Sequence, residues 1–129
     1  MPLIRAADAV HFTLGEASFT GLAAPSRGSR ENAVWRVRLT STVPGAVHSL
    51  DHEEVLVALG GRAVATLDGA DHDVAPGDCL IVGPGSPFAL RCAEPLDGGP
   101  PAFEAIAVLP AGATACLAGG EPFTPPWAQ

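Results

Sequence analysis

Turn-forming residues interrupt this sequence at intervals too short for long helices. The 129 residues include 15 glycines and 13 prolines, and pairs such as Pro44-Gly45, Asp68-Gly69 and Gly83-Pro84 separate short apolar stretches. Glycine and proline both destabilise helix interiors. Asp-Gly in addition tolerates the positive φ angles of a tight hairpin turn. The chain is therefore predicted to consist of short β-strands.

Within the apolar stretches, side chains alternate with a period of two, as in a strand. Trp35, Val37 and Leu39 share one face of such a stretch, and Arg36 and Arg38 share the other. This pattern is typical of a half-buried strand with its apolar side chains on the core and its arginines in water. If the arginines faced inward instead, they could bind an anionic ligand through bidentate contacts.

The alternation and the turn signals together predict about ten strands, with hairpin turns at Gly60-Gly61 and Asp68-Gly69. The predicted strands cover residues 10–14, 16–24, 33–43, 46–49, 54–59, 62–67, 70–74, 79–82, 88–92, 102–109 and 113–117. Regular turn spacing of this kind favours a small β-sandwich or barrel. The length suits one domain over residues 1–129, with N-terminal strands at 10–24, a core at about 33–109 and a surface tail at 119–129.

Charge and composition exclude several classes of partner. The formal net charge is −7, with seven arginines and no lysine, so binding to nucleic acid is disfavoured. No apolar run approaches the roughly 20 residues of a membrane span, and the N-terminus lacks an apolar signal core. Cys79, Cys92 and Cys116 form no CxxC pair. We expect three reduced, mostly buried thiols in a cytoplasmic protein.

Residues 48–61 resemble the first sequence motif of the cupins, G(x)5HxH(x)3–4E(x)6G. His48, Glu54 and Gly61 fall in register with that motif, whereas its opening glycine falls on Thr42 and its second histidine on Leu50. The resemblance covers roughly residues 33–109, and the glycines, the hairpin spacing and the Pro76-Gly77-Asp78 turn carry most of it.

Residues 77–88 resemble this second cupin motif, G(x)5PxG(x)2H(x)3N. Gly77 and Gly85 match it, and its proline is displaced by one position to Pro84. The motif's histidine falls on Phe88 and its asparagine on Cys92. The resemblance implies an all-β fold, a double-stranded β-helix or jelly-roll barrel with a central pocket.

The resemblance also implies a comparison with the metal site of many cupins, which is made by three histidines and one glutamate. His48 and Glu54 keep two of the four positions, while Leu50 and Phe88 occupy the others and offer no lone pair. Catalytic metal sites usually have three protein ligands. We therefore expect no metal cofactor at this position. If a divalent ion such as Zn, Fe, Mn or Ni does bind, its ligands would be His48, Glu54 and possibly His52.

The other histidines are weaker candidates for a site. His52 is expected to be a solvent-facing residue of the turn at 51–53, His72 an exposed strand residue, and His11 a residue too far from the pocket to contribute.

Without a metal, His48 and Glu54 remain as two titratable groups on neighbouring inward strands. Such a pair could act as general acid and base, or it could be a catalytically idle pair hydrogen-bonded to each other. Leu50 and Phe88 would desolvate Glu54 and raise the pKa of its carboxyl group. The sequence has no tyrosine, which disfavours the sugar-epimerase reaction that the resemblance would otherwise suggest.

Three functions follow as expectations. The first is the binding of a small organic molecule in a pocket lined by His48, Leu50, Glu54 and Phe88. The second is an isomerase, cyclase or lyase activity that uses His48 and Glu54, or an altered metal site. The third is a ligand-free structural or dimerisation module.

A homodimer is expected as well, because strands at 10–24 would leave a sheet edge to be covered. Phe123 and Trp127, in the tail, are expected to pack on the barrel or on a partner subunit.

Overall fold

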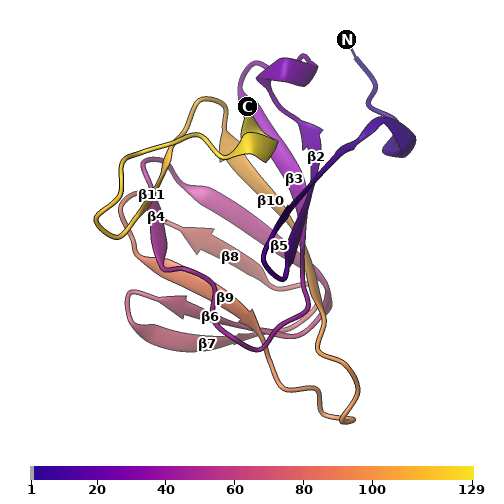
Figure 1. The fold of residues 1–129 in the computed structure, drawn as a ribbon, viewed down its shortest axis with the longest axis vertical. Helices are drawn as coiled ribbons and strands as arrows, with labels where there is room; N and C mark the ends of the chain where they lie inside the picture. Colours follow the sequence, from indigo (N-terminus) through magenta and orange to yellow (C-terminus); the bar gives the residue numbers. More distant parts are fainter. Residues whose placement is uncertain (1) are drawn as a thin grey trace.

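Two antiparallel β-sheets face each other in the computed structural model, which describes residues 2–129 (Figure 1). The six-stranded sheet has the order β1 (Val10–Leu14), β2 (Ala17–Ala23), β3 (Asn32–Leu39), β10 (Phe103–Pro110), β5 (Glu54–Gly61), β8 (Cys79–Val82). The five-stranded sheet has the order β11 (Ala115–Leu117), β4 (His48–Leu50), β9 (Phe88–Cys92), β6 (Ala63–Leu67), β7 (Ala70–Val74). Three single-turn 3-10 helices complete the chain: η1 (Ala6–Asp8), η2 (Pro25–Arg27) and η3 (Pro126–Ala128).

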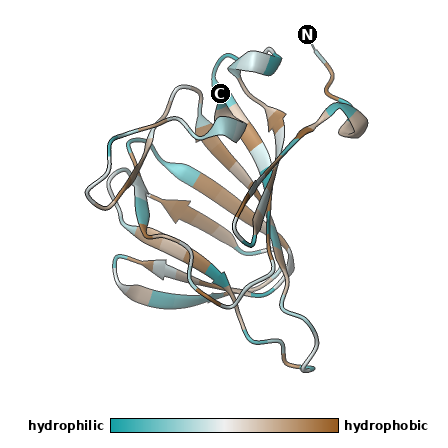
Figure 2. Cartoon of the chain, viewed as in Figure 1, coloured by the Kyte–Doolittle hydropathy of each residue, from teal (hydrophilic) through white to brown (hydrophobic). Residues whose placement is uncertain are grey.

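Strand β10 lies at the centre of the six-stranded sheet, between β3 and β5. Ala107 pairs with Trp35 on one side and with Leu56 on the other. All three side chains are buried, and the alanine is fully so. A small residue between two large ones lets the inner faces interdigitate at the density of a protein core. The core therefore lies between the sheets, and hydrophobic colouring follows the central strands while β7 is largely hydrophilic (Figure 2).

The hairpin predicted at Asp68-Gly69 is confirmed. Asp68 has a φ of 49° and Gly69 a φ of 81°, and β6 pairs with β7 on either side of them. Positive φ at both central residues is the requirement of a type I′ turn.

The hairpin predicted at Gly60-Gly61 is wrong. Both glycines belong to β5, where they pair with Glu104 and Phe103 of β10, and the chain then leaves the six-stranded sheet for β6 in the other sheet. Gly61 has a φ of 71°, and a Cβ atom there would lie 1.9 Å from the carbonyl oxygen of Ala102. The glycine is needed for this close approach between β5 and the start of β10.

Several predicted strand limits also change. The strand expected at 33–43 ends at Leu39, that at 46–49 is β4, and that at 113–117 begins at Ala115. These ends lie next to loops, where backbone hydrogen bonding rather than side-chain pattern sets the boundary.

The cysteines are free, as expected, but they are not mostly buried. Cys92 is buried, Cys116 is half-buried and Cys79 is exposed. The alternation of β8 explains this, because Leu80 and Val82 take the inner face and leave Cys79 on the outer one.

The tail packs on the six-stranded sheet through Trp127, as predicted. Its ring stacks on Phe19, with centroids 3.7 Å apart and planes 1° apart, and meets the ring of Phe12 edge-on. Phe123 behaves differently. Its backbone pairs with Ala115, but its side chain is 43% exposed.

Within residues 2–129, no helix has the length and apolar character needed to cross a bilayer.

Candidate binding site in the barrel

Glu54 is the only charged or polar side chain that is buried among the described residues, with 5% exposure. It opens β5 and points inward with Leu56, opposite Val82 of β8. In the part of the chain that the structure describes, its carboxyl group forms no hydrogen bond or ion pair. Burial raises the pKa of this carboxyl group from 4.5 to about 8. The rise in this pKa is the direction expected from the sequence. At neutral pH, most molecules therefore carry Glu54 in its protonated form.

His48 lies on β4, directly opposite Phe88 of β9. The two rings are 4.2 Å apart, centroid to centroid, at 47°. The Nδ1 atom of His48 lies 3.0 Å from the carbonyl oxygen of Ala46. A carbonyl oxygen can only accept, so Nδ1 carries the hydrogen and, in the neutral ring, Nε2 keeps its lone pair. His48 is therefore arranged to accept a hydrogen bond at Nε2.

The expectation that His48 and Glu54 lie on neighbouring strands needs correction. Strands β4 and β5 follow each other along the chain, but β4 belongs to the five-stranded sheet and β5 to the six-stranded one. The tight turn at Asp51–Glu53 carries the chain across. These two described residues form no hydrogen bond with each other, so the idle hydrogen-bonded pair is not the arrangement found.

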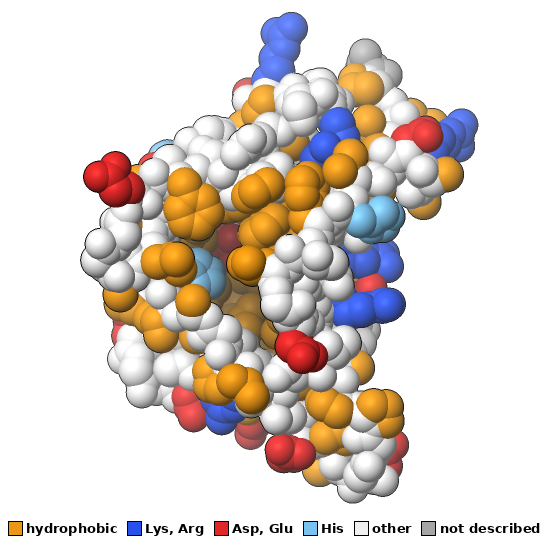
Figure 3. All heavy atoms as spheres, viewed as in Figure 1, with side chains coloured by type: hydrophobic (Ala, Val, Ile, Leu, Met, Phe, Trp, Pro, Cys, Tyr) orange, Lys and Arg blue, Asp and Glu red, His pale blue; other side chains and the backbone are white. Residues whose placement is uncertain are grey.

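Leu50 and Phe88 are both buried, at 3% and 2% exposure, and belong to the same core cluster as the inner side chains of β5. Figure 3 shows that the face between the two sheets is hollowed. Hydrophobic side chains surround the hollow, and a histidine and, deeper, an acidic side chain are visible inside it. His48 is half-buried and Glu54 is buried.

Two further grooves lie elsewhere on the surface. The larger has a volume of about 440 Å³, and its lining includes Leu50 but none of His48, Glu54 and Phe88 among the described residues. The smaller, of about 340 Å³, runs between β7 and β8 and is lined by His72, Asp73, Asp78 and Ile81, among others.

His52 lies in the turn between the sheets with its side chain 54% exposed. Its Nδ1 atom is 2.8 Å from Oδ1 of Asp51. That hydrogen bond, followed by one from the backbone N–H of Thr114, lowers the pKa of the Asp51 carboxyl group. His52 is thus an exposed residue that is hydrogen-bonded to Asp51, and His11 and His72 are exposed too.

The described residues do not fit the metal centre that the cupin resemblance implies. Among them, no group of three or more His, Cys, Asp or Glu side chains is placed to hold a metal ion. His48 and Glu54 are the donors at the expected positions, and the buried Leu50 and Phe88 supply carbon atoms only.

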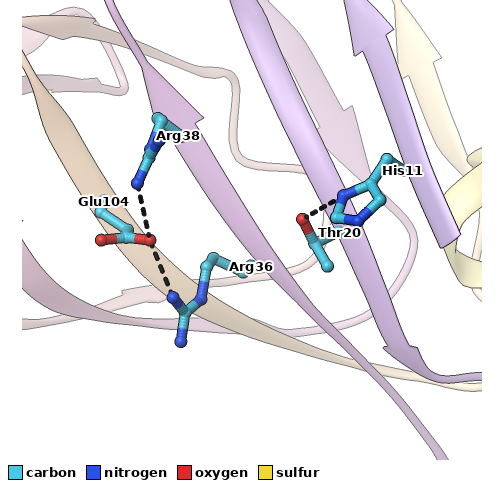
Figure 4. A network of polar contacts seen from close by, with 5 residues as sticks. All are labelled: His11, Thr20, Arg36, Arg38 and Glu104. Carbon is cyan, nitrogen blue, oxygen red and sulfur yellow. Dashed lines mark hydrogen bonds and ion pairs between the residues drawn. The ribbon is translucent and has the colours of Figure 1, made fainter. Parts of the chain in front are cut away.

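Arg36 and Arg38 point away from this interior, as the alternation predicted. Figure 4 shows both reaching Glu104 of β10, whose Oε1 is 3.0 Å from Arg36 and 3.7 Å from Arg38. They therefore take no part in a site inside the barrel. Sequence reasoning did not identify Glu104 as their shared partner, since the pairing depends on β10 lying next to β3.

The role of the Ala46 carbonyl was also missed. It fixes the tautomer of His48 through the backbone, so no side-chain pattern in the sequence could have indicated it.

Comparison with known proteins identifies the fold. No family model and no curated protein matches the sequence. Solved structures do match in shape. The polyketide cyclase RemF from Streptomyces resistomycificus superposes with a TM-score of 0.73 and 16% identity, over 88% of this chain and 81% of that one.

Two further structures cover a similar extent. An RmlC-like cupin from Shewanella frigidimarina NCIMB 400 gives a TM-score of 0.68 and 16% identity, over 84% of this chain and 88% of that one. KdgF from Halomonas sp. gives a TM-score of 0.65 and 12% identity, over 84% of this chain and 93% of that one. With its two antiparallel sheets, the protein has the cupin fold, a double-stranded β-helix of the jelly-roll type.

Proposed function

We propose that this protein binds a small organic molecule in the mouth of its barrel, with the protonated carboxyl group of Glu54 as a hydrogen-bond donor. One observation carries the proposal: Glu54 is 5% exposed and has no polar partner among the described residues. Its carboxyl oxygens are not fully enclosed, so they can be reached by a ligand that enters the hollow between the sheets. A ligand oxygen would supply the missing acceptor.

The surrounding side chains indicate the chemistry of the ligand. Leu50 and Phe88 offer apolar and aromatic contact, and the ring of His48 lies against that of Phe88. Nε2 of His48 can accept a hydrogen bond from a ligand hydroxyl group. The ligand class that suits these groups is an apolar or aromatic molecule with a carbonyl and a hydroxyl group.

We infer that this binding needs no metal ion. The barrel interior offers two side chains that could ligate a metal ion, His48 and Glu54, whereas a divalent ion usually has at least three protein ligands. A protonated Glu54 is also a poor metal ligand, because coordination requires the carboxylate.

The proposal is tested by titrating small phenolic and carbonyl compounds, such as hydroxybenzaldehydes, into the protein. The amide NMR signals of the protein are recorded at each ligand concentration. Binding should shift signals around Glu54 and Phe88. Glu54→Leu should weaken it at least tenfold, whereas Glu54→Gln keeps an N–H donor and should weaken it less. Glu53→Gln, on the exposed neighbour, is the matched control. Shifts confined to the 440 Å³ groove, or equal affinity in Glu54→Leu, would overturn the proposal.

The second candidate is an acid–base enzyme of the isomerase, cyclase or lyase type. Glu54 holds a proton near neutral pH, and Nε2 of His48 is arranged as an acceptor, so one group could donate while the other accepts. The likeness to a polyketide cyclase is one of fold, at 16% identity, but it makes cyclisation a reasonable reaction to assay first.

Binding and catalysis can be separated. If the protein only binds, Glu54→Gln and His48→Gln change affinity and no compound is converted. If it is an enzyme, both variants lose turnover more than they lose affinity. A protein that binds none of these compounds would instead be the ligand-free module of the third expectation.

A further inference from the structure

The inner face of the five-stranded sheet carries a row of side chains that continues past His48 to the edge of the sheet. Phe88 of β9 pairs with His48 of β4, and His48 pairs in turn with Leu117 of β11. Residues directly opposite each other on neighbouring strands project their side chains to the same face. Leu117 therefore lies on the face that carries His48 and Phe88, which is the face towards the hollow between the sheets.

A second row lies two residues further along the same strands. Leu50 of β4 pairs with Ala115 of β11, and Ala115 pairs with Phe123 of the tail through two backbone hydrogen bonds of 2.7 and 2.9 Å. Leu50 and Ala115 are buried between the sheets, so the side chain of their partner Phe123 leaves the tail on the inner side too. The tail thus adds an aromatic side chain to the β11 side of the hollow, next to β4 (Figure 1).

Exposure increases along both rows towards the edge of the sheet. In the first row it rises from 2% at Phe88 to 44% at Leu117, and in the second from 3% at Leu50 to 43% at Phe123. Large apolar side chains on the inner face of a sheet are usually buried by the elements packed against it. These two are on the inner face and nearly half exposed, so they offer apolar contact surface to a molecule that occupies the hollow.

We propose that Leu117 and Phe123 form an outer subsite for a second ring of the ligand, so that the preferred ligands have two or more fused rings. The inference rests on the proposed binding function of the hollow. Adjacent strands lie about 4.8 Å apart, so the backbones at Phe88 and Leu117, two strands apart, are separated by roughly 10 Å. This distance exceeds the length of one six-membered ring. A ligand that contacts both residues therefore needs a further ring, and this ring is apolar because both rows are apolar apart from His48.

The experiment compares two ligands that differ by one fused ring, a hydroxybenzaldehyde and the corresponding hydroxynaphthaldehyde. Their affinities are measured by NMR titration of the native protein and of variants whose fold is checked by circular dichroism. The native protein should bind the two-ring compound at least tenfold more tightly, because the second ring buries further apolar surface. Leu117→Ala and Phe123→Ala should each lower this ratio of affinities at least threefold. Leu14→Ala, which shortens an exposed leucine on β1, is the matched control and should keep the native ratio.

Nuclear Overhauser effects locate the second ring directly, since its protons should contact the methyl groups of Leu117. Equal affinity for the two compounds, or a tenfold ratio that both folded variants retain, would overturn the outer subsite. In either case, binding of the single-ring compound that depends on Glu54 would leave the proposed function standing. If the native protein binds neither compound, the proposed function is wrong and the outer subsite falls with it.

Discussion

His48 and Phe88 are direct cross-strand partners, and their rings lie 4.2 Å apart at the point where β4 meets β9. Residues directly opposite on neighbouring strands have Cβ atoms about 5 Å apart. A histidine at position 88 would therefore lie beside His48, at a separation that one metal ion can bridge. The pairing of β4 with β9 thus places positions 48 and 88 close enough for two histidines to share one metal ion.

The first prediction rebuilds that metal site. Phe88→His combined with Leu50→His should raise the affinity for Zn²⁺ or Ni²⁺ at least tenfold over the native chain, measured by isothermal titration calorimetry. Each change also puts a polar group into the core and should cost about 1–3 kcal/mol of unfolding free energy. Adding His48→Ala to the double variant should abolish the gain. A folded double variant with no gain would mean that positions 48, 50, 54 and 88 do not converge.

The second prediction concerns the pH dependence of stability. The carboxyl pKa of Glu54 is about 8 in the folded protein, against an ordinary value of 4.5. Between these values the folded state holds a proton that the unfolded state has lost, so the unfolding free energy falls as pH rises. The stabilisation is complete below about pH 4.5 and is lost by pH 8, with an upper limit of about 5 kcal/mol.

Denaturant unfolding at pH 5, 7 and 9 checks this. Glu54→Gln cannot titrate, so it should lose much less stability than the native protein over this range and be the more stable of the two at pH 9. Glu53→Gln should follow the native curve. Parallel profiles for the native protein and Glu54→Gln would show that Glu54 is not protonated in the folded state.

The third prediction uses the two adjacent glycines at the end of β5. Gly61→Ala would place a methyl group 1.9 Å from the Ala102 carbonyl oxygen at a φ of 71°, and should cost more than about 3 kcal/mol or prevent folding. Gly60 has no atom within 4 Å of the corresponding position and an ordinary φ, so Gly60→Ala should change stability by less than about 1 kcal/mol. Urea unfolding of both variants makes the comparison, and equal stabilities would contradict it.

The fourth prediction concerns the tail. Trp127→Ala removes the stack on Phe19 and should lower the unfolding free energy by about 2–3 kcal/mol, less than for a fully buried tryptophan. Phe123→Ala, in the same tail, removes a side chain that is 43% exposed and should cost less than about 1 kcal/mol. Thermal unfolding of the two variants compares their stabilities. A larger loss of stability in Phe123→Ala than in Trp127→Ala would contradict the packing of the tail through Trp127.

Sequence reasoning succeeded where the cause of structure is local. Asp68-Gly69 forms the predicted hairpin because two positive φ angles are a property of the dipeptide itself. Alternation placed Trp35 and Val37 in the core and Arg36 and Arg38 outside for the same reason, since strand geometry alone sends neighbours to opposite faces.

It failed where the outcome depends on distant partners. Gly60-Gly61 has turn-forming residues too, but pairing with β10, more than forty residues later in the chain, keeps it in a strand. The site was limited in the same way. The inward position of Glu54 follows from alternation, whereas the sheet to which His48 belongs depends on pairing with β9 and β11, which no local pattern determines.

The central position of β10 has a consequence for synthesis of the protein on the ribosome. Until residues 103–110 emerge, β3 and β5 each lack a neighbour on one side, and the six-stranded sheet is divided into two unfinished parts. Unpaired strand edges of this kind favour aggregation, and pairing over a long sequence separation is slow. The nascent chain therefore carries two open, apolar strands from the completion of β5 until β10 emerges, and its yield in cells should depend on chaperones that cover them over that interval.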